Sequence, residues 1–130
     1  MTKSEKDNIS EWFKKADHDL IAAHKLIVDA DILDTVCFHC QQAAEKYLKA
    51  YLIFKGIEPE RTHNLKDLKK DCAKFDVDFN AFDFKDLTHY ASNARYPDDF
   101  MEPLPQEAQY YLEIAEKVKE LVLSKINPSL

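Results

Sequence analysis

A single glycine, Gly56, among 130 residues is the feature that most restricts what this chain can fold into. Dinucleotide-binding folds and P-loops need several glycines, because their backbones turn tightly and approach phosphates closely. Two-residue hairpin turns also favour glycine. These nucleotide-binding folds and hairpin-rich β-folds are therefore disfavoured. The chain is 45% hydrophobic, which is enough for one core, and a single domain over residues 1–130 is expected.

The formal net charge of −6 disfavours general binding to duplex nucleic acid, although a local basic patch stays open. The first six residues are polar and lack the apolar core of a secretory signal. No apolar run reaches the roughly 18–20 residues needed to cross a membrane. Three cysteines, an odd number, favour free thiols in a reducing compartment. We therefore expect a cytoplasmic protein that does not bind membranes.

Apolar side chains recur at three- and four-residue steps, as on amphipathic helices. This spacing predicts five helices, at about 4–30, 34–55, 64–75, 80–95 and 105–126. No segment shows strand-like alternation. The second helix is apolar around most of its circumference, so it should be central. The expected fold class is all-α, a five-helix antiparallel up-and-down bundle.

Capping residues and one polar arc refine this prediction. Asp31 or Asp34 is expected to cap the second helix, and Gly56 to end it in the left-handed conformation. Thr62 or Asn64 is expected to cap the third helix. The second helix has one polar arc that should face outward or into a groove, formed by Gln42, Glu45, Lys46 and Lys49.

The run Cys37-Phe38-His39-Cys40 has the spacing of a metal knuckle. A closed zinc site needs two further ligands, which only folding could supply from Cys72, His24 or His63. The alternative, which we favour, is that both thiols are small buried residues without nucleophilic reactivity. No metal and no cofactor are expected.

Arg95 and Tyr96 are candidates for ligand binding. A guanidinium donates fork-shaped hydrogen bonds to phosphate, and a tyrosine ring can stack on a base. The alternative is that Arg95 caps its own helix or pairs with a nearby aspartate. His63, at a predicted helix start, is a candidate general base or phosphate contact, or a loop histidine bonded to backbone.

We expect Arg95, Tyr96 and His63 to line one polar cleft, with Lys46 as a further cation. Such a local positive island could hold a phosphate while the acidic surface repels bulk nucleic acid. The competing interpretation places these four residues on separate faces, in ordinary surface ion pairs. The catalytic residues, if there are any, are not indicated.

Four segments together resemble the HEPN family (higher eukaryotes and prokaryotes nucleotide-binding). The run Phe38-His-Cys-Gln-Gln-Ala-Ala-Glu-Lys-Tyr-Leu-Lys-Ala-Tyr-Leu52 is similar to the second-helix signature of that family. Gly56 followed by Thr62-His-Asn-Leu65 is similar to its Gly … Thr-His-x-Leu element, and Ala94-Arg-Tyr-Pro97 to its Arg-Tyr-Pro element. The segment Ala16–Ala23 resembles its first helix, so the resemblance covers almost the whole chain.

The resemblance implies an all-α domain that usually forms a homodimer and often partners a minimal nucleotidyltransferase, sometimes as a toxin–antitoxin module. Many relatives are metal-independent ribonucleases that use an Arg-x(4–6)-His motif, but neither Arg95 nor Arg61 is followed by histidine at that spacing. Binding of a nucleotide or of an RNA phosphate, including single-stranded RNA, without cleavage is therefore the favoured function. A degenerate ribonuclease using Arg95 with His63 or His89, and a purely structural interaction adaptor, remain the alternatives.

Overall fold

The computed structural model describes residues 1–92 and 102–126, which contain four α-helices, three short 3-10 helices and no strand. The α-helices are α1 (Lys3–Leu26), α2 (Leu33–Phe54), α3 (Leu65–Ala73) and α4 (Pro105–Ile126). The 3-10 helices are η1 (Ala30–Ile32), η2 (Val77–Ala81) and η3 (Leu87–Tyr90). Among the described residues, no helix is both long and apolar enough to cross a lipid bilayer.

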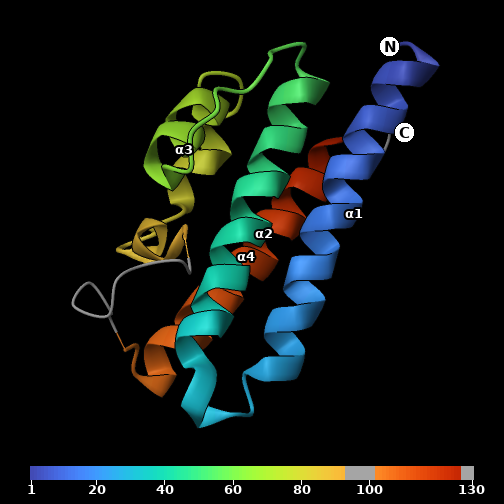
Figure 1. Cartoon of the computed structure of the whole chain (residues 1–130). Helices are drawn as coiled ribbons and strands as arrows, with labels where there is room; N and C mark the ends of the chain where they lie inside the picture. The colour runs from blue at the N-terminus through green and yellow to red at the C-terminus, as the bar shows by residue number, and fades with distance from the viewer. Residues whose placement is uncertain (93–101, 127–130) are drawn as a thin grey trace.

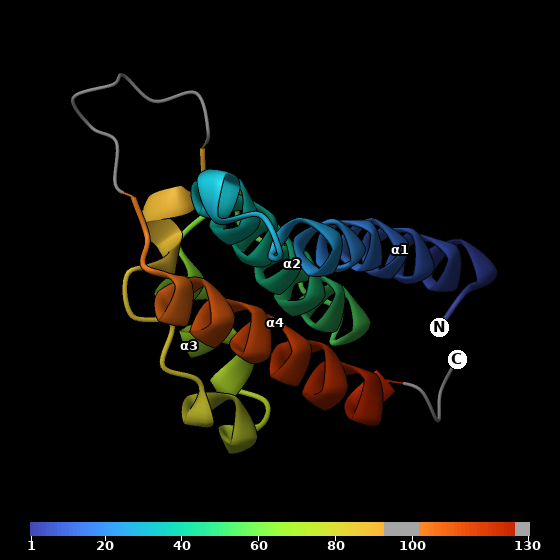
Figure 2. The same cartoon turned by 90° about the horizontal axis from the view of Figure 1, so that it is seen from below.

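The long helices form an up-and-down arrangement. In Figure 1, α1 descends, α2 ascends beside it, and α4 ascends behind both. The return between α2 and α4 is made by α3 and the two 3-10 helices that follow it. Figure 2 shows the bundle from below, and there α4 lies on the side of α2 that is at the back in Figure 1. One face of α2 is therefore left uncovered by α4.

Helix α2 is central, as predicted, and its apolar side chains supply much of the core. Tyr47, Leu48 and Tyr51 are almost completely buried there. Small residues Ala16 and Ala23 on α1 and Ala43 and Ala44 on α2 are fully buried, which fits closely approaching helices. The remaining large core residues include Ile9, Leu65, Leu68, Phe79, Phe84, Leu87, Val118 and Ile126.

The end of α2 has the predicted left-handed glycine. Gly56 has a φ of 79°, which residues with a Cβ seldom adopt. The amide of Ile57 donates to the carbonyl of Leu52 at 2.9 Å, and the amide of Gly56 donates to that of Ile53 at 2.9 Å. These two bonds form a Schellman motif, so the only glycine of the chain terminates the central helix.

The predicted cap of α2 is wrong. Its N-cap is Ile32, which makes no side-chain capping bond. Asp29 instead accepts a hydrogen bond from the amide of Asp31 and so caps the preceding 3-10 turn. Asp34 lies in the first turn of α2, where its negative charge favours the positive helix end. At α3 the cap is Asn64, one of the two predicted candidates.

The fourth of the five predicted helices, over 80–95, is absent from the described part of that range, which contains 3-10 turns and loop residues instead. Asp76 accepts from the amide of Asp78, and Asp83 from the amide of Lys85. Such local side-chain bonds compete with helix formation. Lys85 also has a positive φ of 48°. The described helix count is therefore four, and residues 93–95 lie outside the described residues.

Candidate functional site

Glu45, near the middle of α2, is a carboxylate buried inside the protein, with only 4% of its surface exposed. Its Oε1 accepts from Gln41 Nε2 at 3.2 Å and contacts His63 Nδ1 at 2.8 Å. Its Oε2 accepts from Lys49 Nζ at 2.9 Å. Lys49 is itself only 6% exposed. An unpaired buried charge is costly, and this set of partners removes that cost.

His63 is held to α2 through both its backbone and its ring. Its carbonyl accepts a hydrogen bond from Gln41 Nε2 at 3.0 Å, and its Nδ1 contacts Glu45. The His63 side chain is nevertheless 65% exposed. When Nδ1 donates to the carboxylate, Nε2 accepts in the neutral ring and donates in the protonated ring. The ring is thus oriented from the interior and available at the surface.

Gln42 connects α2 to the segment that leads towards the Arg-Tyr-Pro run. Its Nε2 donates to the carbonyl of Ala91 at 3.3 Å and to Gln41 Oε1 at 2.8 Å. The amide of Leu65 donates to Thr88 Oγ1 at 3.1 Å, which attaches the start of α3 to η3. The segment that contains His63 and the segment that contains Ala91 are therefore both attached to α2, through Gln41 and Gln42.

Lys46 lies on the side of α2 that faces α1. Its Nζ donates to Asp19 Oδ2 at 2.6 Å, and the other oxygen of Asp19 contacts His39 Nδ1 at 2.8 Å. The side chains of Lys46 and His39 keep 23% and 25% of their surface exposed. Lys46 and His63 thus bind different carboxylates, one on α1 and one on α2.

Lys49 bridges the two sides. Its ammonium contacts Glu45 and also lies 5.8 Å from the centroid of the Trp12 ring on α1. Of the two predicted orientations of the polar arc, outward or into a groove, the outward one does not hold for Glu45 and Lys49, because Trp12 and the segment carrying His63 pack over them. We use the name α2 groove for this polar arc of α2, between α1 and residues 61–64, in which Glu45 and Lys49 are buried and Gln42 and Lys46 are half-buried.

Of the four predicted site residues, the structure describes two. His63 and Lys46 both lie along the α2 groove, with separate partners. Arg95 and Tyr96 lie outside the described residues, so the shared cleft remains a prediction. His89, the alternative histidine, lies in η3 and is half-buried.

The cysteines are free and buried. Burial is the main cause that raises the pKa of the Cys37 and Cys72 thiols to about 12, and it also raises the pKa of Cys40. Cys72 Sγ donates to the carbonyl of Leu48 at 3.6 Å. These are the inert core residues favoured by the sequence. Across residues 1–92 and 102–126, no three metal-binding side chains of the His, Cys, Asp and Glu types converge.

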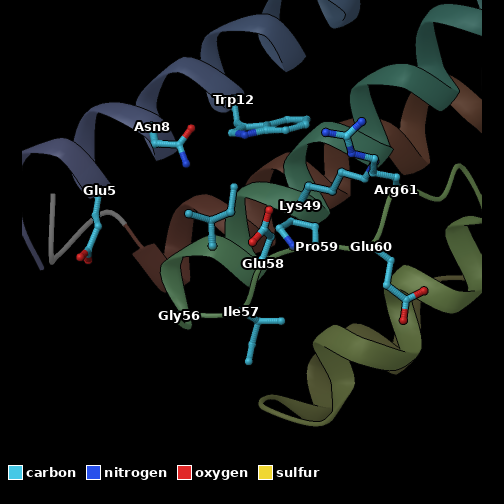
Figure 3. A pocket seen from close by; sticks show the side chains of 11 residues that line it. Glu5, Asn8, Trp12, Lys49, Gly56, Ile57, Glu58, Pro59, Glu60 and Arg61 are labelled. Atoms are coloured by element: carbon cyan, nitrogen blue, oxygen red, sulfur yellow. The ribbon is translucent and has the colours of Figure 1, made fainter.

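A pocket of about 760 Å³ opens at one end of the α2 groove (Figure 3). It lies between α1 and the segment that follows α2. Its volume is within the range typical of small-molecule sites. Eleven residues line it: Glu5, Asn8, Trp12, Lys49, Ile53, Gly56, Ile57, Glu58, Pro59, Glu60 and Arg61.

Sequence reasoning missed three residues of this region. Gln41, Glu45 and Lys49 recur at four-residue steps, and this stripe could have identified Gln41 as a partner of Glu45. Trp12 fits the apolar spacing of the first helix, and spacing alone cannot distinguish a partly exposed aromatic side chain from a buried one. Arg61 was considered only for the spacing to a histidine, whereas its position in a pocket depends on the fold.

Three comparisons place this geometry among known proteins. The family model of the HEPN domain matches residues 9–126. Among solved structures, the crystal structure of an archaeal HEPN homologue matches with a TM-score of 0.63 and 27% sequence identity, over 91% of this chain and 97% of that chain. No curated protein matches significantly.

Proposed function

Because this chain belongs to the HEPN domain family, we propose that it is a homodimeric module whose α2 groove binds a phosphate of a nucleotide or of single-stranded RNA. The family relationship is established by a match over most of the chain. The ligand and the dimer are the proposal, and the geometry of His63 is the observation that supports it.

His63 combines exposure with orientation from inside the protein. Its ring is fixed at Nδ1 by the buried Glu45, while 65% of the side chain stays accessible. In the protonated ring both nitrogens donate, so Nε2 can hydrogen-bond a phosphate oxygen while Nδ1 stays on Glu45. A side chain held in place before binding loses less conformational freedom when the ligand arrives.

Lys46, Arg95 and Tyr96 complete the proposed site. Lys46 contributes positive charge, since its partner Asp19 leaves part of the side chain exposed. Gln42 hydrogen-bonds the carbonyl of Ala91, and Arg95 is four residues further along the chain. In the proposal, Arg95 binds the phosphate as a fork and Tyr96 stacks on a base.

We propose binding rather than cleavage. The Arg-x(4–6)-His motif that the resemblance associates with ribonuclease activity has no counterpart after Arg95 or Arg61. A minimal nucleotidyltransferase is proposed as the protein partner, in a toxin–antitoxin arrangement. Its identification requires purification of the protein from its native host with bound proteins and nucleic acids analysed together.

Binding of a short single-stranded RNA at two salt concentrations tests the proposal. We expect Arg95→Ala and His63→Ala to weaken binding and to reduce its salt dependence, because each removes a phosphate contact. The control is Lys66→Ala, which removes one positive charge from an exposed position on α3 and should have little effect on RNA binding.

Equal binding by the wild type and by both variants would reject the phosphate site. RNA cleavage abolished by Arg95→Ala would favour the degenerate ribonuclease instead. A dimer whose stability no nucleotide or RNA changes would favour the structural adaptor.

A further inference from the structure

The pocket at the end of the α2 groove has a flat aromatic wall. Trp12 is partly buried against the core and lines the opening with Ile53 and Pro59. Figure 3 shows the indole nearly edge-on above the open space. Flat aromatic side chains of this kind are surfaces on which nucleic-acid bases stack, with little dependence on base identity. The pocket therefore favours a planar heterocycle.

The polar groups of the pocket are divided by charge. In Figure 3, the Asn8 amide lies to the left of the indole, the Glu58 carboxylate lies below it, and the Arg61 guanidinium lies to its right. Neither Glu58 nor Arg61 forms an ion pair with any residue in the described part of the chain. A carboxylate accepts hydrogen bonds, and a guanidinium donates them. A suitable ligand carries an amine at one end and an anion at the other.

The charge balance of the pocket disfavours the binding of a small anion alone. Three carboxylates, of Glu5, Glu58 and Glu60, line the pocket, and the ammonium of Lys49 is already paired with Glu45. Inorganic phosphate bound in the pocket could pair with Arg61 but would lie close to these three carboxylates. A bare phosphate is therefore disfavoured by like charge, whereas a heterocycle that donates hydrogen bonds is favoured.

We propose that this pocket holds a nucleobase that carries an exocyclic amine, with adenine as the probe. The base lies against Trp12, the amine donates to Glu58, and the attached phosphate lies at Arg61. From there the chain of a bound RNA continues towards His63, two residues further along. The inference thus rests on the proposed function and adds to it a preference for one class of base.

The only tryptophan of the chain makes the inference directly measurable. Adenosine monophosphate should change the emission of Trp12 in a saturable way, because a stacked base alters the surroundings of the indole. Inosine monophosphate has the same phosphate but a carbonyl in place of the amine. It should bind ~10-fold more weakly, because an oxygen facing Glu58 loses a charge-assisted hydrogen bond.

Two variants separate the two ends of the ligand. Glu58→Gln should reduce the difference between adenosine and inosine monophosphate, since an amide can both donate and accept. Arg61→Ala should weaken the binding of adenosine monophosphate and leave the binding of adenosine, which has no phosphate, unchanged. Glu113→Gln on α4 and Lys66→Ala on α3 are matched controls for each lost charge. Calorimetry with Trp12→Leu, which should lose binding, provides a readout independent of emission.

Several results would overturn the inference. These are an unchanged Trp12 emission, equal binding of the two monophosphates, displacement by inorganic phosphate at equal concentration, or the same emission change with oligolysine alone. The last result would identify a pocket for basic side chains. If RNA binds through Arg95 and His63 while Trp12 emission stays constant, the base pocket fails and the proposed function stands. Adenosine monophosphate at Trp12 without RNA binding would show the reverse.

Discussion

A carboxylate buried in a helical bundle is costly unless its oxygens are paired, and Glu45 has three donors around it. They come from α2 itself, through Gln41 and Lys49, and from the segment before α3, through His63. One side chain therefore fastens a chain segment to the central helix and orients a surface histidine. Structure and proposed binding depend on the same contact.

Replacement of Glu45 by alanine should lower the free energy of unfolding by roughly 3–5 kcal/mol, because Lys49 would remain buried without its counter-charge. Urea unfolding measures this value. The control is Asp71→Ala, which removes the partner of the largely exposed Lys74 and should cost less than about 1 kcal/mol. Equal effects of the two substitutions would contradict a buried ion pair at Glu45.

The buried thiols predict how stability depends on pH. Burial raises the pKa of Cys37 and Cys72 from 9.0 to about 12 in the folded protein. Between these values the unfolded thiols lose their protons and the folded ones keep them, so the unfolded state binds fewer protons. The contribution of these thiols to stability is therefore constant below about pH 9 and falls above it, by up to about 1.4 kcal/mol per pH unit for each thiol.

Urea unfolding at pH 8 and pH 10 measures this change. Cys72→Ala should make the loss of stability between the two pH values smaller, whatever its effect at pH 8. In the native protein at pH 8, a thiol reagent should react with none of the three cysteines until the chain is unfolded. Rapid labelling of the native protein would show that the thiols are accessible.

At the level of the elements, α3 depends on a short capping sequence. Asn64 Oδ1 accepts from the amides of Lys66 and Asp67, at 3.0 and 3.2 Å. These bonds satisfy amides that have no partner inside the helix. The cap directly follows His63, so the start of α3 also sets where the imidazole leaves the backbone.

Asn64→Ala should reduce the free energy of unfolding by about 1 kcal/mol, the usual cost of losing such a cap. Thermal or urea unfolding measures the change. Asn80→Ala, at an exposed position in η2, is the matched control and should have a smaller effect. If RNA binding weakens in Asn64→Ala but not in Asn80→Ala, the cap also positions His63. A loss no greater than that of Asn80→Ala would show that Thr62 or water replaces the cap.

The return from α2 to α4 shows why element count is hard to predict. Phe79, Phe82 and Phe84 are buried in the core. On a continuous helix Phe82 and Phe84, two residues apart, would point to opposite sides. Phe79 lies in η2, and Phe82 and Phe84 lie in the loop that follows it. Aspartate side chains bond to nearby amides in this segment, which competes with a continuous helix. At the C-terminal end of α4, Lys125 contacts both Asp76 and Asp78, which attaches η2 to that helix.

For the whole molecule, the homodimer is a prediction supported by family membership. The described aromatic residues give no independent evidence of a dimer interface, since most of their rings pack in the core of one protomer. Phe75, at 45%, is the exposed exception among residues 1–92 and 102–126. Light scattering at micromolar concentration should nevertheless give twice the 15.1 kDa mass of one chain. A mass of one chain, unchanged on dilution and with RNA added, would reject the dimer.

Much of the fold follows from local rules that can be read in the sequence. Apolar spacing located α1, α2 and α4 to within a few residues, except that α1 ends at Leu26, before the predicted Ala30. Gly56 marked the end of α2, because a left-handed residue is needed there. These features depend on neighbours within about one helical turn. The similarity of four segments to the HEPN family was also visible, and the family match confirms it.

The tertiary structure decided what the polar residues do. Glu45 and Lys49 lie on the most polar arc of α2, which spacing assigns to the surface, yet Trp12 and the segment at His63 cover them. Whether a polar arc of a helix is covered depends on chain segments far away in the sequence. The periodicity of that helix depends only on its own residues and cannot indicate those segments. The same reason applies to the pocket, where Trp12 and Arg61 meet only because α1 and the segment after α2 fold side by side.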